Sequence, residues 1–292
     1  MNAYLQLLRP HQWLKNVFVF APVFFSYNLM KSEAIVPTLV AFASFCLISS
    51  SIYCINDAHD AEADRQHPKK CGRPVAAGRV SKGGAFMLSG FCAIGSIALL
   101  MFIHTDTPWL PYAIVVGYWL MNMAYCFRLK HYAILDIFCI ATGFVMRVLM
   151  GGIVTDIWVS QWLVLLTFLL ALFLALTKRY DDYAIFERTG TLPRQSIKQY
   201  NSTFIIMSIV LVASVTLVCY IMYTMSESVM ERFGTPYLYL TSIWVTAGLL
   251  RFMQNMIVYE RSGSPTKTLL EDHFIHLCLV GWLVSFYIII YV

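Results

Sequence analysis

Long apolar stretches, separated by short polar segments, recur along the whole of this 292-residue chain. Most are close to the ~20 residues that a helix needs to cross a bilayer. Their ranges are 13–30, 35–55, 84–103, 110–127, 132–153, 161–177, 203–224, 236–254 and 273–292. A membrane β-barrel needs segments of ~10 residues in which polar and apolar positions alternate, and these runs are continuous. The pattern therefore predicts an all-α, multi-pass membrane bundle of nine transmembrane helices.

Composition leads to the same class of protein. Hydrophobic residues make up 59% of the chain and charged residues 13%, which is too few polar groups to cover a water-soluble surface. This excludes a disordered chain, a coiled coil and a soluble globule. The eight cysteines are scattered, without a CxxC pair, so neither disulfides nor a metal knuckle is expected. We expect no removable signal peptide, a single membrane domain over 1–292 and no nucleic-acid partner, while oligomeric state is left open.

Lys and Arg residues are divided unequally between the two sides of this bundle. Eighteen of the 21 lie in or beside the segments on one side, which are 1–12, 56–83, 128–131, 178–202 and 255–272. The opposite side holds only Lys31 and Arg232, and Arg147 lies inside a span. Because cytoplasmic segments carry the excess of Lys and Arg, the N-terminus is predicted to be cytoplasmic and the C-terminus outside. The polar chemistry is then expected at the cytoplasmic face of the cell (inner) membrane.

The strongest candidate site follows the second apolar stretch and has the spacing NDxxDxxxD. It consists of Asn56, Asp57, Asp60 and Asp64. On a continuous helix the three carboxylates fall within an arc of about 60°, where they repel one another. A bound Mg²⁺ would relieve this repulsion, since it takes hard oxygen ligands and shares them with substrate phosphates. The three aspartates are therefore predicted to be catalytic, metal-binding residues; the alternative is a solvated acidic helix end paired with lysines.

Basic residues follow this acidic motif directly. Arg65, Lys69 and Arg73 are candidate ligands for a polyphosphate, whose oxygens are shared between a metal and cationic side chains. The alternative for this segment is a topology signal or contact with lipid headgroups. That alternative explains Arg73, which stands between Gly72 and Pro74, less well.

The second long polar segment begins at the end of the 161–177 stretch. Its candidate substrate-binding residues are Lys178, Arg179, Tyr180 and Asp182. Two cations beside aspartates at a helix end can hold a phosphate together with metal-linked water. The alternative is a membrane-exit cluster with local ion pairs.

Two further cations are candidates for phosphate binding. Lys15 lies about half a helical turn from Trp13, an expected interfacial anchor, so it either faces the bundle or extends to lipid headgroups. Arg147 is placed mid-span, where a charge usually faces the bundle interior and has a function. Its expected partner is an anionic substrate group or a buried carboxylate, and the alternative is a structural ion pair. Asp136 lies on the same face but ~16 Å away along the helix, too far to pair directly.

The segments that carry these candidates resemble the UbiA superfamily of intramembrane prenyltransferases. Within it they look most like the branch of decaprenyl-phosphate phosphoribosyltransferases. The matching segments are 9–16, 53–57, 60–65, 67–69, 73–78, 124–127, 129–131, 147, 151–152, 178–180 and 187–190. The NDxxDxxxD motif marks the superfamily, whereas Lys-Arg-Tyr at 178–180 and Glu-Arg-Thr-Gly at 187–190 mark the branch.

The resemblance implies a nine-helix bundle around a cavity open to the cytoplasm and to lipid. It implies Mg²⁺ as cofactor, 5-phosphoribosyl 1-diphosphate as donor and a polyprenyl (decaprenyl) phosphate as acceptor, with release of diphosphate, in cell-wall arabinan precursor synthesis. The three aspartates would hold Mg²⁺ at the donor's diphosphate. The cations that would clamp the phosphates are Lys15, Arg73, Lys178 and Arg179, and Arg147 would serve the lipid phosphate or shape the cavity.

One departure from the wider superfamily bears on the choice of substrates. Ordinary members carry a second motif, DxxxD, whereas here Ile185 and Phe186 stand four residues after Asp181 and Asp182. This favours two separately phosphorylated substrates over the runner-up function, transfer of a prenyl group from a prenyl diphosphate to a small acceptor. A transporter or lipid carrier is a third possibility. It is disfavoured because the polar residues gather at one face instead of breaking helices in two matching halves.

Overall fold

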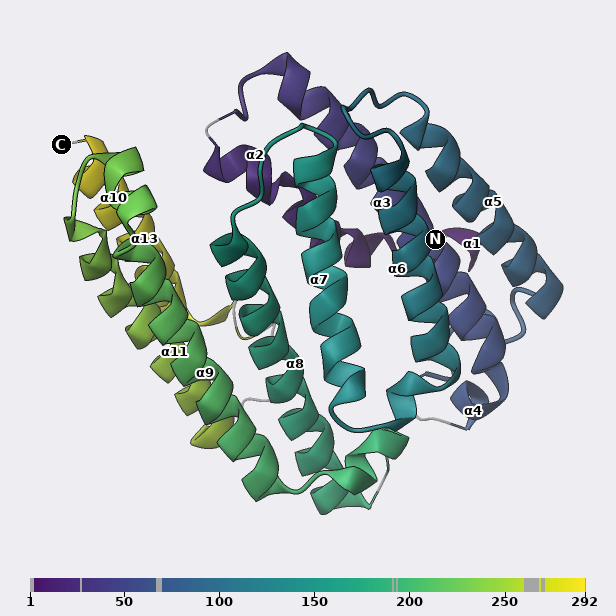
Figure 1. Cartoon of the computed structure of the whole chain (residues 1–292). Helices are drawn as coiled ribbons and strands as arrows, with labels where there is room; N and C mark the ends of the chain where they lie inside the picture. The colour runs from purple at the N-terminus through teal and green to yellow at the C-terminus, as the bar shows by residue number, and fades with distance from the viewer. Residues whose placement is uncertain are drawn as a thin grey trace. The chain divides into compact units, whose positions relative to one another are not determined.

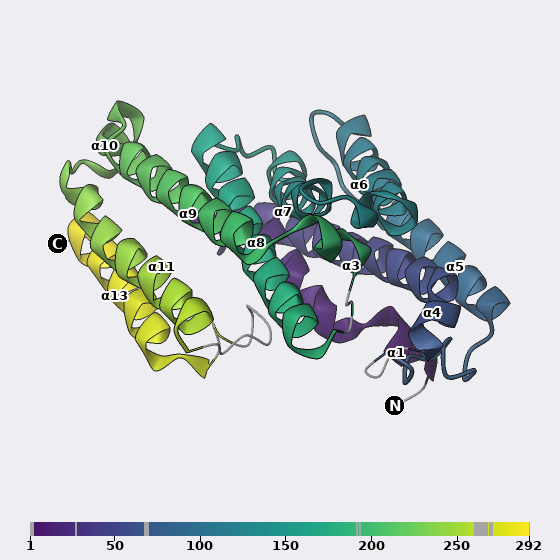
Figure 2. The same ribbon diagram turned by 90° about the horizontal axis from the view of Figure 1, so that it is seen from below.

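The computed structural model describes residues 3–26, 28–66, 70–190, 192, 194–259, 268 and 271–291. Within these ranges all regular structure is helical, as the apolar pattern predicts. The chain forms two compact units, which Figures 1 and 2 show from two directions. The first consists of Met1–Leu129 with Thr142–Ser160, and the second of Lys130–Ala141 with Gln161–Val292. Helix α7 (Leu135–Ile153) begins in the second unit and ends in the first.

The first unit is built on the long helix α3 (Ser32–His59), which lies alongside α5 (Lys82–Leu100) in both views (Figures 1 and 2). Serine pairs join the two helices. Ser44 Oγ lies 2.8 Å from Ser96 Oγ, and Ser51 Oγ lies 2.8 Å from Ser89 Oγ. Small residues let helices approach closely in lipid, and their hydroxyls bond across the interface.

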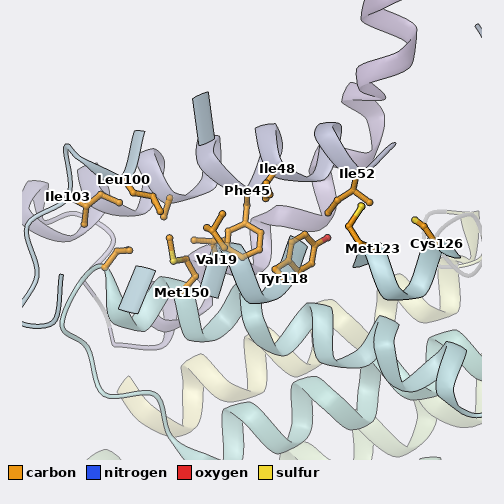
Figure 3. Close-up of a cluster of buried hydrophobic side chains, with 13 residues drawn as sticks. Val19, Phe45, Ile48, Ile52, Leu100, Ile103, Tyr118, Met123, Cys126 and Met150 are labelled. Atoms are coloured by element: carbon orange, nitrogen blue, oxygen red, sulfur yellow. The ribbon is translucent and has the colours of Figure 1, made fainter. Parts of the chain in front are cut away.

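The core of this unit lies between α3, α6 (Trp109–Phe127) and the second half of α7 (Figure 3). The ring of Phe45 on α3 packs against that of Tyr118 on α6, with 5.2 Å between the centroids. Met150 from α7 and Val19 from the N-terminal segment lie close to these rings (Figure 3). The N-terminal segment therefore forms part of the core.

The N-terminal segment is not the spanning helix predicted over 13–30. It forms the 3₁₀ helix η1 (Pro10–Phe20) and the short helix α2 (Ala21–Phe25). Trp13 is half-buried and donates from Nε1 to Ser50 Oγ at 3.0 Å, so it bonds within the unit rather than only anchoring the chain at the interface. Pro22 has no N–H to continue a helical ladder through this position. The hydrogen bond of Trp13 to α3 and the proline at position 22 thus favour two short helices here over one long α-helix.

The second unit contains α8 (Gln161–Thr189), α9 (Ser202–Thr224), α11 (Ser242–Ile257) and α13 (His273–Tyr291). Trp244 on α11 packs on Gly281 of α13, and its Nε1 donates to Ser285 Oγ at 2.9 Å. The predicted span 236–254 is divided here into η4 (Tyr237–Thr241) and the 16-residue α11. A short helix, α10 (Glu227–Phe233), precedes it.

Seven of the helices in the described ranges are long and apolar enough to cross a membrane. They are α3, α5, α6, α7, α8, α9 and α13. The all-α membrane architecture is thus confirmed, whereas nine spans and a cytoplasmic N-terminus stay predictions. The two predicted spans that fall below this length, 13–30 and 236–254, both contain a 3₁₀ segment.

Candidate functional site

The acidic motif lies where α3 ends. The helix stops at His59, Asp60 stands at a bend, and α4 (Ala61–Arg65) follows. The sequence predicted that the three carboxylates share one face of a continuous helix. In the structure they do not, because the bend at Asp60 divides that helix in two. The bend is tight, because the N–H of Asp60 still donates to Asn56 O at 2.9 Å and that of Asp64 to Asp60 O at 2.8 Å. The chain therefore changes direction at Asp60 while it keeps helical hydrogen bonds on both sides of the bend.

One arginine brings two of the three carboxylates together. Arg73 Nη1 lies 3.2 Å from Asp57 Oδ1 and 2.6 Å from Asp64 Oδ2. Both aspartates are buried, whereas the Arg73 side chain is 25% exposed. Because one nitrogen contacts both carboxylates, the two carboxylates lie close together in space. Their positions on a shared helix face would not by themselves bring them this close.

A second arginine, absent from the sequence candidates, completes this group. Arg9 Nη2 donates to Asp57 Oδ1 at 2.6 Å, and the guanidinium lies 5.1 Å from the centroid of the Tyr53 ring. Arg9 and Asp57 are 48 residues apart, so no spacing in the sequence connects them. The signals that could have found it are its place in an Arg-Pro step just before the first apolar run and in the matching segment 9–16. We call Arg9, Asp57, Asp64 and Arg73 the arginine–aspartate cluster.

Apolar packing positions the segment that carries Arg73. Val75 and Val80 are buried in a cluster with Leu7 of α1 (Ala3–Leu8). Arg65 Nε donates to Ala76 O at 3.0 Å and ties this segment to α4. Arg65 therefore acts on the fold of the segment in addition to its predicted role in substrate binding.

The remaining predicted residues of the first unit differ in how far their side chains are exposed. Asn56 and Asp60 are half-buried, and Lys15 is exposed on η1. Lys69 lies outside the described residues. In the described part of the chain, no group of three or more His, Cys, Asp or Glu residues is arranged to hold a metal ion. Asp57 Oδ2, however, is buried and has no hydrogen-bond partner within the same described ranges.

Arg147 is buried in the first unit, as its mid-span position predicts, but its partners are neutral. Its Nε donates to Asn16 Oδ1 at 2.7 Å, Nη1 to Gly143 O at 2.6 Å and Nη2 to Tyr118 Oη at 2.7 Å. The rings of Phe45, Tyr118 and Phe144 surround its guanidinium carbon at 4.9 to 5.6 Å. These bonds and rings take the place of the carboxylate that the sequence led us to expect as its protein partner.

The second polar cluster lies on α8, which continues to Thr189, so residues 178–189 are helical rather than a loop. The guanidinium of Arg179 has no exposure. Its Nε lies 2.7 Å from Asp136 Oδ2, and its Nη1 contacts Asp182 Oδ2. Asp136 comes from the first turn of α7. The side chain that the sequence predicted as a phosphate ligand is thus already shared between two carboxylates.

Asp136 also holds the segment that follows α8. It accepts hydrogen bonds from Tyr200 Oη at 3.1 Å and from Ser196 Oγ at 3.2 Å, on either end of η3 (Gln195–Gln199). Burial raises the pKa of Tyr200 to about 12, and the charge of Asp136 acts in the same direction. The phenol therefore stays protonated at neutral pH and remains a donor to Asp136. This role of Asp136 was not predicted from the sequence.

The accessible side chains of this second cluster are those around Arg179. Lys178 is exposed, and Tyr180 and Asp182 are half-buried. Arg194 Nε lies 3.7 Å from Asp182 Oδ2, which adds a second cation beside that carboxylate. Lys178, Tyr180 and Asp182 can therefore meet a ligand, whereas Arg179 is enclosed.

Comparison with known proteins relates this geometry to a family. The model of the UbiA prenyltransferase family matches residues 17–287, nearly the whole chain. The chain belongs to the UbiA prenyltransferase family. The match runs across both compact units and includes the NDxxDxxxD motif and the Lys-Arg-Tyr step.

Relatives of this UbiA family member include two proteins named decaprenyl-phosphate phosphoribosyltransferase. The one from Mycolicibacterium smegmatis is 33% identical, over 97% of this chain and 91% of its own length. The one from Corynebacterium glutamicum is 32% identical, over 99% of this chain and 86% of its own length. Among solved structures, a UbiA homolog from Archaeoglobus fulgidus bound to GPP and Mg²⁺ superposes with a TM-score of 0.72. It is 19% identical and covers 99% of this chain and 100% of its own, so it shares the fold.

Proposed function

We propose that this UbiA family member transfers 5-phosphoribosyl from 5-phosphoribosyl 1-diphosphate to a polyprenyl phosphate and releases diphosphate. Two relatives that carry the corresponding name align over nearly the full chain. The observation that carries the proposal is the convergence of Asp57 and Asp64 on Arg73. Paired carboxylates beside accessible cations suit a donor that presents a diphosphate together with a metal ion.

The residues present fit a magnesium ion at this position. Mg²⁺ is commonly held by one or two carboxylates, with waters and substrate phosphates as its other ligands, rather than by a complete protein cage. Asp57 and Asp64 converge, and Asp57 Oδ2 is buried without a partner. We propose that these two aspartates hold the ion, with Asp60 at the bend between them as a further ligand. When bound, Mg²⁺ supplies positive charge that neutralises the leaving diphosphate.

Residues of the chain bind and orient the two substrates. Arg73 contacts a diphosphate oxygen of the donor, with Arg65 and Lys69 of the same segment as further cations and Asn56 as a polar contact. The bond between ribose C1 and the diphosphate oxygen breaks, and a bond between C1 and a lipid-phosphate oxygen forms. Since that phosphate is already an anion near neutral pH, no strong general base is needed and positioning contributes most.

The exposure of each side chain decides the role that we propose for the cations and polar groups outside the arginine–aspartate cluster. We propose that Lys15 on η1 and Lys178, Tyr180 and Asp182 on α8 contact phosphorylated substrate, because their side chains are accessible. Arg179 positions Asp182 from the interior instead of touching substrate. Arg147, bonded to three neutral groups, keeps the first unit packed.

The excess of Lys and Arg on one side further supports a location in the cell inner membrane, with the site at the cytoplasmic face. The pathway that such a product serves, cell-wall arabinan precursor synthesis, is part of the same proposal. We propose that residues 1–292 act as a single UbiA-like membrane domain, of which the family model matches 17–287.

Incubating the purified protein with Mg²⁺, decaprenyl phosphate and donor radiolabelled in the ribose tests the proposal. We expect a labelled lipid, and a loss of at least ~100-fold in Asp64→Asn, because the charge that holds the metal is gone. Glu62→Gln is the matched control, since Glu62 is fully exposed and contacts Lys82.

Two results would contradict the proposal. The first is label that stays in the aqueous phase while a prenyl diphosphate and a small aromatic acceptor give product. This would support the runner-up, prenyl transfer. The second is full activity of Asp64→Asn, which would remove the metal assignment.

A further inference from the structure

We infer that Arg9 is a further substrate-binding cation, which occupies Asp57 until a divalent cation and a phosphorylated substrate bind together. The inference rests on the proposed function for the identity of the substrate. The competition between Arg9 and a divalent cation for Asp57 depends only on the contacts in the first unit. It can therefore be tested without turnover.

The contacts place Arg9 and a metal ion in competition for the same oxygen. Asp57 Oδ1 accepts from Arg9 Nη2 at 2.6 Å and lies 3.2 Å from Arg73 Nη1, whereas Asp57 Oδ2 has no hydrogen-bond partner among the residues that the structure describes. Both guanidiniums therefore contact Asp57 Oδ1, and neither donates a hydrogen bond to Asp57 Oδ2. A buried carboxylate oxygen without a partner is unfavourable, and a divalent cation would satisfy it.

Charge balance explains why the metal and a polyanion would bind together. The arginine–aspartate cluster has two cations and two carboxylates, so it is neutral by itself. A divalent ion added between the two carboxylates of the cluster leaves an excess of two positive charges, or of one where Asp60 also binds the ion, and this excess repels both guanidiniums. The side chains of Arg9 and Arg73 are 20% and 25% exposed, so both can turn to an arriving phosphate while Asp57 stays buried. A diphosphate supplies the missing negative charge.

The backbone at Arg9 is held in place by α3. Arg9 has φ 51° and ψ 59°, the left-handed region that residues other than glycine seldom adopt. The carbonyl oxygen of Leu8 accepts from Ser50 Oγ at 2.9 Å, and Ser50 Oγ also accepts from Trp13 Nε1 at 3.0 Å. Bonds on both sides of Arg9 fix this conformation, which aims the side chain across Tyr53 to Asp57.

The far end of the same segment is anchored by Arg147. Asn16 is buried in η1, accepts from Arg147 Nε and donates from Nδ2 to Cys46 Sγ at 3.3 Å. Further along, the Val19 backbone lies so close to Gly151 of α7 that a Cβ there would overlap the Val19 carbonyl. Arg147 is thus a positioning residue, and it acts on the acidic motif through the segment that begins with Arg9.

Binding of Mn²⁺, a spectroscopic substitute for Mg²⁺, to the purified protein is the first test. In electron paramagnetic resonance titrations without substrate, we expect Arg9→Gln to bind Mn²⁺ about tenfold more tightly than the parent protein, because a competing cation is removed. Asp57→Asn should lose the binding. Lys82→Gln removes one positive charge from the ion pair with Glu62, outside the cluster, and should leave the affinity unchanged.

Kinetics provide the second test. Arg9→Gln should raise the KM for the phosphoribosyl donor about tenfold or more and leave the KM for decaprenyl phosphate within twofold. Arg9→Lys, which keeps the charge, should recover part of the donor KM. Arg9→Gln is thus expected to bind Mn²⁺ more tightly and the phosphoribosyl donor more weakly. A purely structural defect would weaken the binding of both.

Mn²⁺ binding that is unchanged or weaker in Arg9→Gln, with Lys82→Gln at the parent value, would overturn the inference. If Arg9→Gln does not fold, the same titration on Arg9→Asn decides, because asparagine also removes the competing charge and tolerates the left-handed backbone at this position. If the parent protein transfers no phosphoribosyl group, the proposed function fails while the Mn²⁺ result still decides the role of Arg9.

Discussion

Arg179 and Asp136 form an ion pair without solvent exposure, with 2.7 Å between Nε and Oδ2. Arg179 Nη2, equally buried, has no hydrogen-bond partner in the described part of the chain. The pair connects the start of α7 to the middle of α8, and Tyr200 and Ser196 bond to the same carboxylate. The interior of the second unit therefore depends on a charge pair that water cannot replace.

Removing one member of this pair should destabilise the protein strongly. In Asp136→Asn the buried guanidinium loses the charge of the more deeply buried of its two carboxylates, so we expect a loss of ~3–5 kcal/mol in unfolding free energy, measured by denaturation in detergent. The double variant Asp136→Leu/Arg179→Met, which removes both charges, should recover most of that loss. If Asp136→Asn is as stable as the parent, the pair is not a structural element.

Glu62→Gln is the matched control for this prediction. The hydrogen bond from Lys82 and its charge lower the pKa of Glu62, yet both side chains face solvent. Because exposed ion pairs contribute little, the melting temperature of this variant should equal that of the parent.

Replacing Gly151 should test how closely the N-terminal segment approaches α7. A Cβ at Gly151 would overlap the carbonyl of Val19, so Gly151→Ala must push η1 away and should lower stability by ~1–3 kcal/mol. Because η1 also carries Asn16, the variant should in addition raise the donor KM.

Gly90→Ala serves as its control. Gly90 lies within α5 and has open space where a Cβ would stand, so alanine should be neutral or stabilise the helix by up to ~1 kcal/mol. Equal stability of the two alanine variants would contradict the close approach at Gly151.

The serine pairs between α3 and α5 should be coupled energetically. A double-mutant cycle of Ser44→Ala and Ser96→Ala should give a coupling energy of ~0.6 kcal/mol, typical of hydrogen bonds between membrane helices. Unfolding in mixed micelles measures it. Pairing Ser44→Ala with Ser89→Ala, which bonds to Ser51 instead, should show smaller coupling.

Cys71 allows the predicted orientation to be tested. It is exposed in the segment that carries Arg73, whereas Cys46, Cys54, Cys92 and Cys126 are buried. If the N-terminus is cytoplasmic, a membrane-impermeant maleimide should label Cys71 in inside-out vesicles and not in intact cells, and Cys71→Ser should abolish that label. Labelling in intact cells would reverse the orientation.

Much of the architecture follows from the sequence, because a helix in lipid must be apolar over a length fixed by the bilayer. Seven of the predicted stretches are helices of that length. The first and eighth stretches are not single α-helices of that length, because hydropathy does not register how Trp13 and Asn16 bond to other helices or that α11 is divided from η4.

The candidate site was predictable in its residue types and less so in its partners. NDxxDxxxD identified Asp57 and Asp64, since carboxylates at a membrane boundary stand out in an apolar chain. That Arg73 joins them was also within reach, because it is near in sequence. Arg9 and Asp136 were not, because their partners lie 48 residues away in one case and on a different helix in the other.

The sequence by itself determined that this is a helical membrane protein of the UbiA type with its charges gathered in a few polar segments, because apolar length and charge are properties of single segments. Only the tertiary structure decided which cations neutralise which carboxylates. Ion pairs are made through space, and the fold enclosed Arg179 while it left Arg73 accessible.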